Sequence, residues 1–258
     1  MVYLVILLFV AHIFGDFYLQ RNGFCEQKRD EAWYGWHKIL HACIIYCLSW
    51  LVTWSGYGWW LAGIIAVSHW GIDVLKSIVE KNILVKESET KSWKDPRYLL
   101  VTFVVDQLLH LIIIVVSAYL WTCYNAYEPF GCFVSDFSNK VLLFVIAILV
   151  AHRPANILIS LVLRFCQVGN DVDGGEGNHE NFRSGALIGT FERLLIIFFV
   201  VLGQYEAIGF LIAAKSILRF PETTKGSEKA EYVLAGTFIS VAIALLLGIL
   251  IINKLWLL

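Results

Sequence analysis

Residues 98–121 have the sequence YLLVTFVVDQLLHLIIIVVSAYLW, which decides the class of the fold. A helix needs about 20 apolar residues to cross the hydrocarbon core of a bilayer, and this stretch is long enough. Apart from tyrosines, its only ionisable side chains are Asp106 and His110. Ionisable groups at membrane depth usually face the interior of a helix bundle and mark a functional site. The stretch therefore predicts a membrane helix whose polar pair faces other helices.

The whole chain has the composition of a membrane protein. Of its 258 residues, 59% are hydrophobic and 16% are charged, whereas soluble domains are about 45–50% apolar and about 25% charged. This composition excludes a disordered chain and an ordinary cytosolic enzyme. The net charge of -1 and the lack of a purely basic stretch argue against a nucleic-acid partner. We predict an all-α polytopic bundle of eight membrane helices, at 2–20, 38–54, 58–79, 98–121, 140–163, 185–203, 206–219 and 231–252.

The positions of lysine and arginine predict how the chain crosses the membrane. These residues collect in alternate loops, at 21–36, 80–97, 164–184 and 219–230. By the positive-inside rule, the basic loops face the cytoplasm and both termini lie on the outer side. We expect three regions: a four-helix half that carries the site at 1–121, an outer loop at 122–139 and a second membrane half of about four helices at 140–258.

Histidine and aspartate side chains recur in pairs with one spacing. The pairs are His12 with Asp16, His37 with His41, His69 with Asp73, and Asp106 with His110. Residues four positions apart lie on one face of a helix, about one turn apart. Two helix residues can bind one metal ion at this spacing. With the predicted topology, all the pairs lie in the cytoplasmic half of the bilayer.

These pairs predict a site for one or two divalent metal ions. Nitrogen and oxygen ligands without thiolate favour zinc, manganese or iron, and inward carboxylates and histidines hold two metals in other helix bundles. The predicted ligands are His12, Asp16, His41, His69, Asp73, Asp106 and His110. Asp16, Asp106 and Lys76 are expected to take part in catalysis, one carboxylate serving as general base. The alternatives are a proton relay or a layer of interhelical hydrogen bonds.

Several polar side chains outside the ligand set are candidates for substrate binding. They are Gln20, His37, Gln107, Arg153, Arg193, Lys215 and Arg219. The cations among them lie in the second half, where they could together bind an anionic head group or phosphate. Ion pairing with Glu192 and Glu231 is the other interpretation of these cations.

Four motifs resemble a family of bacterial membrane proteins known only as a domain of unknown function. The motifs are His12-x3-Asp16, His37-x3-His41, Ser68-His69-x3-Asp73 and Asp106-Gln107-x2-His110. The resemblance continues through 153–156 and 203–215, and it implies a protein of the bacterial inner membrane without a known activity. The element Ser68-His69-x3-Asp73 also resembles, more weakly, one found in inner-membrane metal-dependent hydrolases.

Together these observations predict a metal-dependent hydrolase embedded in the bilayer. Its substrate would be an amphipathic lipid ester or lipid-linked phosphate that enters from the cytoplasmic leaflet, so membrane lipid is the expected partner. The oligomeric state is left open. One alternative is an ion- or proton-coupled transporter or channel, although the one-sided depth of the site argues against a permeation path. Another is a non-catalytic membrane partner with a structural metal.

Overall fold

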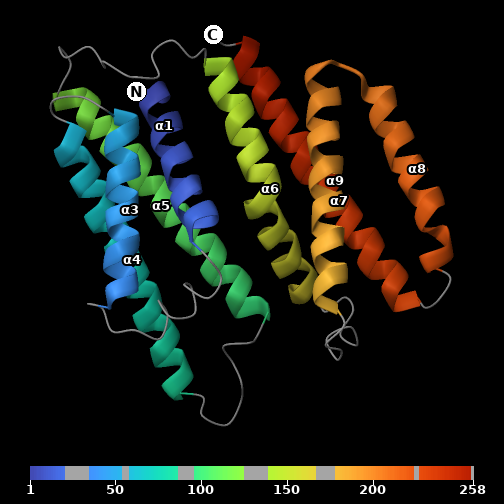
Figure 1. Ribbon diagram of the computed structural model, residues 1–258, viewed down its shortest axis with the longest axis horizontal. Helices are drawn as coiled ribbons and strands as arrows, with labels where there is room; N and C mark the ends of the chain where they lie inside the picture. The colour runs from blue at the N-terminus through green and yellow to red at the C-terminus, as the bar shows by residue number, and fades with distance from the viewer. Residues whose placement is uncertain are drawn as a thin grey trace. The chain divides into compact units, whose positions relative to one another are not determined.

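The computed structural model describes residues 1–20, 35–53, 58–86, 96–124, 139–166, 178–223 and 227–256. Every regular element in these ranges is a helix, and helices cover all the expected apolar segments (Figure 1). They are α1 (Val2–Ile13), continued by the π-helical η1 (Phe14–Leu19), α3 (Trp36–Thr53), α4 (Gly58–Lys86), α5 (Pro96–Tyr124), α6 (Asn139–Phe165), α7 (Asn178–Val201), α8 (Tyr205–Thr223) and α9 (Ser227–Trp256). The fold is therefore all-α, as the composition predicts.

Five helical segments among the described residues are long and apolar enough to cross a membrane. They are Val2–Leu19, Gly58–Val79, Pro96–Cys123, Val141–Phe165 and Leu234–Ile252. These segments identify the chain as an integral membrane protein. α3 does not qualify, because its 18 residues include His37, Lys38 and His41, which lower its hydropathy. The expectation that eight segments cross the membrane stays a prediction. Parts of the four basic loops and most of 122–139 lie outside the described ranges.

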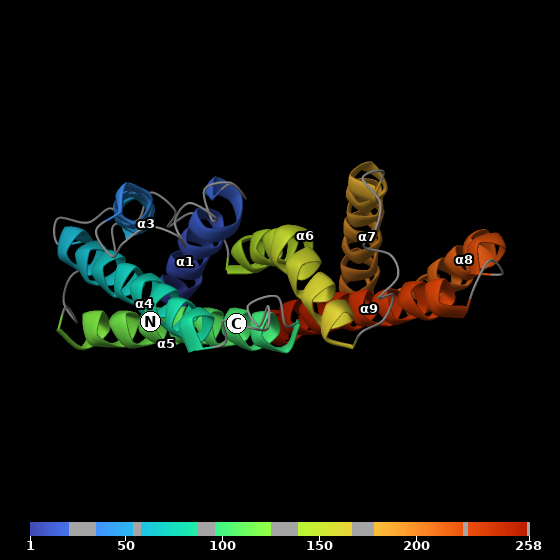
Figure 2. The ribbon, with the colours of Figure 1, turned by 90° about the horizontal axis from the view of Figure 1, so that it is seen from below.

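The chain divides into two compact units, Met1–Leu142 and Leu143–Leu258. In the first unit, each of α1, α3, α4 and α5 packs against two of the others (Figure 2). α1 and α4 each contact both α3 and α5, so the four helices enclose a common interior. One part of that interior is an apolar cluster that includes Leu8, Ile45, Leu61, Ile114 and Trp121.

A glycine allows η1 to approach α3 closely. A Cβ atom at Gly15 would lie only 2.4 Å from Cδ1 of Ile45 on α3, well inside contact distance. The next residue is Asp16, within the same π-helical turn. Single π-helical turns within α-helices are rare and frequently occur at functional sites. This packing therefore fixes the position of the Asp16 carboxylate against α3.

In the second unit, a tight turn joins α7 to α8. Gly203 has φ of 71°, a left-handed conformation that favours glycine. The amide of Gly203 donates to the carbonyl of Val200 at 3.0 Å, and that of Gln204 donates to Phe199 at 2.9 Å. These bonds form a Schellman motif, which satisfies the last carbonyls of α7. α7 and α8 both pack against α9.

Candidate metal centre

One buried cluster takes an ionisable side chain from each of α1, η1, α3, α4 and α5. His12 comes from α1, Asp16 from η1, His41 from α3, His69 from α4 and His110 from α5. The imidazoles are almost fully enclosed, since His41, His69 and His110 are 1%, 2% and 3% exposed. Burying several polar rings together is costly unless their nitrogens find partners. The geometry of their nitrogens therefore indicates what holds the cluster together.

Three ligand atoms from three different helical segments meet at nearly contact distance. The Nε2 atoms of His41 and His69 are 2.9 Å apart, and each lies 3.2 Å from Oδ1 of Asp16. Zinc binds nitrogen and oxygen ligands at about 2.0–2.2 Å, so neighbouring ligands of one ion lie about 3.0–3.5 Å apart. The triangle of His41, His69 and Asp16 closely matches the spacing of ligands around a single ion.

Hydrogen bonding alone leaves this triangle incomplete. Oδ1 of Asp16 lies 3.2 Å from both imidazole nitrogens, yet it is buried and has no hydrogen-bond partner of acceptable geometry. The nitrogens are near enough to the oxygen, but their N–H directions do not point at it. The two Nε2 atoms are hydrogen-bonded to each other, so Asp16 Oδ1 is the atom of the triangle that lacks a partner. The arrangement favours a cation between the three ligand atoms.

Asp73 is placed to extend the triangle. Its Oδ2 atom lies 3.7 Å from Nε2 of His69 and 3.9 Å from Nε2 of His41. Opposite ligands of one ion with bonds of about 2.0–2.2 Å can be up to about 4.2 Å apart. Asp73 therefore fits a fourth ligand position beside His41, His69 and Asp16.

A second group of three ligands shares Asp16. Ligand atoms of His12, Asp16 and His110 all lie within 4.8 Å of one another, and Nε2 of His12 is 3.8 Å from Oδ2 of Asp16. Nδ1 of His110 donates to the carbonyl of Asp106 at 2.8 Å, which leaves Nε2 as the ring nitrogen with a lone pair. That Nε2 atom is buried and has no hydrogen-bond partner. Metal-binding histidines commonly use this second hydrogen bond to fix their tautomer.

Lys76 and Gln107 surround the carboxylate of Asp106 at the edge of the cluster. Lys76 Nζ donates to Asp106 Oδ2 at 3.1 Å, and Gln107 Nε2 donates to the same oxygen at 3.2 Å. Oδ1 of Asp106 is buried and has no hydrogen-bond partner. Gln107 Oε1 also lies 3.3 Å from His12 Nε2. The side chain of Lys76 is 35% exposed, so this edge connects the buried cluster to the outside of the bundle.

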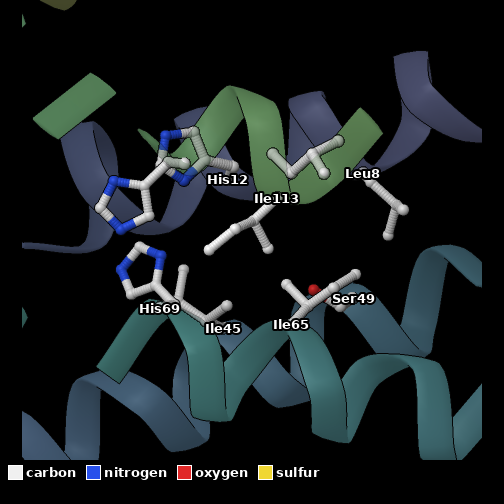
Figure 3. A pocket seen from close by; sticks show the side chains of 9 residues that line it. Leu8, His12, Ile45, Ser49, Ile65, His69 and Ile113 are labelled. Atoms are coloured by element: carbon white, nitrogen blue, oxygen red, sulfur yellow. The ribbon is translucent and has the colours of Figure 1, made fainter. Parts of the chain in front are cut away.

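A small cavity adjoins the histidines. It has a volume of about 10 Å³, which is about the space that one water molecule needs. His12, His69 and His110 line one end of it, and Leu8, Ile65 and Ile114 are among its apolar lining. Figure 3 shows the imidazoles of His12 and His69 at one end of the pocket, with Leu8 toward the other. Each of these aliphatic residues is four positions from a cluster histidine, so an apolar layer covers one side of the site.

A comparison with protein families identifies the part of the chain that carries this cluster. Residues 4–131 match a family model described as a protein of unknown function, DUF3307. These residues belong to the DUF3307 family. All the predicted metal ligands lie within this DUF3307 region, whereas the motifs at 153–156 and 203–215 lie beyond it. No curated protein and no solved structure matched the chain.

Two predicted side chains of the DUF3307 region lie at its helix ends. His37 is half-buried in the first turn of α3 and belongs to neither three-ligand group of the described residues. Gln20 is half-buried and follows η1 directly. Sequence reasoning missed Lys38, which is 1% exposed. The spacing of Lys38, three residues before His41, could have identified it, because residues three apart lie on the same helix face.

In the second unit, Arg193 is buried and held by neutral oxygen atoms. Its Nε donates to the carbonyl of Ala151 at 2.7 Å and its Nη1 to Ser240 at 3.0 Å. Its Nη2 donates to Asn156 at 2.6 Å and to Thr190 at 3.1 Å. The guanidinium thus joins α7 to α6 and α9. The sequence singled out Arg193, and Asn156 lies in the family motif at 153–156, but the sequence did not pair them because they lie on different helices.

The other cations of the second unit lie in different surroundings. Lys215 forms an ion pair with Glu192, which is one of the pairs that the sequence offered as an alternative to anion binding. Arg153 is exposed on α6, and the side chain of Arg219 lies outside the described residues. Arg193 and Lys215 therefore belong to separate sets of contacts, and substrate binding by these cations stays a prediction.

Proposed function

We propose that the DUF3307 region is a membrane-embedded, metal-dependent hydrolase. The observation that carries this proposal is the convergence of His41 Nε2, His69 Nε2 and Asp16 Oδ1 within 2.9–3.2 Å. Histidine and carboxylate ligands favour zinc, manganese or iron over calcium. A divalent ion held there would polarise an ester or phosphoryl oxygen and make a water molecule more acidic.

The surroundings of the ligands favour catalysis over a purely structural metal. A structural zinc site is closed by four ligands, whereas this cluster also contains His12 and His110 beside a cavity of about 10 Å³. This cavity leaves room for one water molecule beside three imidazoles. Asp106 Oδ1 is an unpartnered carboxylate oxygen at the edge of the cluster, and we assign it the role of general base.

Lys76 is the candidate for binding the substrate. Its ammonium group lies 3.1 Å from Asp106 and its side chain is 35% exposed. A cation at the entrance attracts an anionic group and can stabilise negative charge that develops during hydrolysis. This arrangement favours a lipid phosphate or lipid-linked phosphate ester, because the apolar surface of the bundle would be in contact with the acyl chains.

The proposal includes a location for the site. By the positive-inside rule, both termini lie on the outer side of the bacterial inner membrane, and the cluster lies in the cytoplasmic half. Leu8, Ile45, Ile65 and Ile114 then lie on the outer side of the histidines, one helical turn away. A continuous apolar layer at that level supports a hydrolase over an ion channel, whose path would need polar groups on both sides.

The proposal is tested with purified protein in vesicles that contain phosphatidylglycerol, a phosphatidic acid and a polyprenyl diphosphate. Products are followed by mass spectrometry, before and after removal of metal with a chelator. We expect the wild type to consume at least one of these lipids, chelation to stop the reaction, and His69→Ala to lower its rate at least about 100-fold.

His152→Ala is the matched control, because His152 lies on α6 in the second unit and belongs to neither three-ligand group of the described residues. It should retain the wild-type rate. A wild-type protein that binds metal but leaves all three lipids intact would contradict the hydrolase.

A further inference from the structure

The two oxygens of the Asp16 carboxylate face two different sets of histidines. Oδ1 lies 3.2 Å from His41 and His69, while Oδ2 lies 3.8 Å from His12. A carboxylate that offers one oxygen to each of two ligand sets has the geometry of a bridge between two ions. We infer that the centre is dinuclear, with Asp16 bridging one ion held by His41, His69 and Asp73 and a second held by His12 and His110.

Separate helices supply the two ligand sets. The first ion would be bound by α3 and α4, and the second by α1 and α5, with η1 between them. The histidines are close enough for the ions to be neighbours, since the rings of His69 and His110 have centroids 4.1 Å apart. Paired catalytic ions are commonly about 3.5–4 Å apart. One bridging residue in the π-helical turn would thus hold the four helices in register.

The two sets differ in how closely their ligands approach. In the first set, the ligand atoms of His41, His69 and Asp16 already lie 2.9 and 3.2 Å apart, which is close to their spacing around a bound ion. The second set is wider, since His12 Nε2 lies 3.8 Å from Asp16 Oδ2, whereas neighbouring ligands of one ion lie about 3.0–3.5 Å apart. Its side chains must move inward when an ion binds, and His12 must give up the hydrogen bond that its Nε2 donates to Gln107 Oε1. The first ion is therefore expected to bind more tightly than the second.

His110 provides independent support for the second position. Its ring is 3% exposed and lines the cavity with His12 and His69. Nδ1 is used in the bond to the Asp106 carbonyl, and Nε2 is buried without a hydrogen-bond partner. An imidazole lone pair buried in this way costs free energy unless an ion or a proton donor meets it. The second ion supplies the missing partner.

The inference deepens the proposed function, since it concerns the same site, but its test does not depend on hydrolysis. Full-length protein in detergent is freed of metal with a chelator and titrated with MnCl₂. Electron paramagnetic resonance reports free Mn²⁺ and magnetic coupling between neighbouring ions. We expect two Mn²⁺ per chain, bound with affinities that differ at least about tenfold, and a coupled spectrum at full loading.

Single substitutions separate the two positions. His110→Ala should keep one tightly bound Mn²⁺, and His41→Ala should keep one weakly bound Mn²⁺. Asp16→Asn should weaken both positions and abolish the coupling, because a neutral amide bridges poorly. His152→Ala is the control and should bind two ions as the wild type does.

A wild type that binds only one Mn²⁺, or two ions without coupling, would overturn the inference. So would a folded His110→Ala variant that still binds two. Two coupled Mn²⁺ ions in a protein that hydrolyses no lipid would leave the dinuclear centre intact and contradict the hydrolase. A protein that hydrolyses lipid but binds only one ion would overturn the dinuclear centre and leave the hydrolase intact.

Discussion

At the scale of single residues, the environment of each polar group decides its role. Asp16 and Asp106 are both carboxylates in the first unit, but only Asp16 is within 3.2 Å of two imidazole nitrogens. Asp106 is paired with Lys76 and receives a bond from Gln107. This difference is why we assign Asp16 to metal binding and Asp106 to proton transfer.

Replacing Lys76 tests its role at the entrance. Lys76→Met keeps the length of the side chain but removes the cation that faces Asp106. We expect hydrolysis of a lipid phosphate to fall about 10–100-fold, because charge stabilisation is lost, while metal content stays at the wild-type value. Rates in vesicles and elemental analysis of the same preparations measure both.

Arg164→Met is the matched control for this substitution. Arg164 is an exposed cation at the end of α6 and should tolerate the change without loss of rate. Loss of metal in Lys76→Met would refute the separation of substrate binding from metal binding.

Arg193 should be important for the stability of the second unit. Arg193→Lys replaces a guanidinium that makes four hydrogen bonds with an ammonium that cannot reach all the same oxygens. We expect a loss of about 2–4 kcal/mol in the free energy of unfolding, because buried acceptors lose their donors. Unfolding in detergent, followed by circular dichroism, measures the change.

The control for Arg193→Lys is Arg164→Lys, which makes the same substitution at an exposed position on α6. This substitution should change stability by less than about 0.5 kcal/mol. Equal stability of the two variants would show that the Arg193 network contributes little.

At the scale of helices, the sequence predicts most of the architecture. Long apolar runs locate the helices, because only helices satisfy the backbone inside a bilayer without partners. The four-residue spacing places both members of a pair on one face. The sequence does not reveal the π-helical turn at Phe14–Leu19 or the close approach of Gly15 to Ile45, because no local pattern marks either feature. Nor does it identify which helices are neighbours.

Gly15 should be sensitive to a single added carbon. In Gly15→Ala the new Cβ would lie 2.4 Å from Cδ1 at the end of the buried Ile45 side chain, so either Ile45 must turn or η1 must shift away from α3. We expect a loss of about 1–3 kcal/mol in stability from overpacking, together with weaker metal binding, because Asp16 moves with η1. Thermal unfolding and metal titration report the two effects.

Two further variants make this test specific. Gly71→Ala on α4 should be neutral or slightly stabilising, because nothing lies within 4 Å of the added Cβ. Ile45→Val removes the Cδ1 atom that clashes, so the double variant Gly15→Ala with Ile45→Val should recover part of the metal affinity. A Gly15→Ala variant with normal stability and affinity would contradict the close approach.

At the scale of the molecule, the candidate metal site of the described residues belongs to one of two units. All the converging ligands lie in Met1–Leu142, and the DUF3307 match covers residues 4–131. Pair spacing predicts which residues face inward, and the structure brings His12, Asp16, His41, His69 and His110 together. The sharing of Asp16 between two ligand sets could not be predicted, since it depends on how four helices pack in three dimensions.

Two exposed cysteines test the predicted orientation of the chain. Cys123 lies near the end of α5, and Cys166 follows α6. If both termini are outside, a membrane-impermeant maleimide should label Cys123 in spheroplasts but reach Cys166 only after lysis. Each cysteine is kept alone, with the others replaced by serine, and labelling is read by gel shift. The reverse pattern would invert the topology and put the metal cluster in the outer half of the bilayer.

The most direct test of the metal centre is elemental analysis of the wild type, His69→Ala and His152→Ala after purification in detergent without added metal. The account predicts at least one equivalent of zinc, manganese or iron in the wild type and in His152→Ala. It predicts loss of the tightly bound ion from His69→Ala, because His69 Nε2 is within 3.2 Å of both other ligand atoms of the triangle. A metal-free wild type, or a folded His69→Ala with the same metal content as the wild type, would contradict the account.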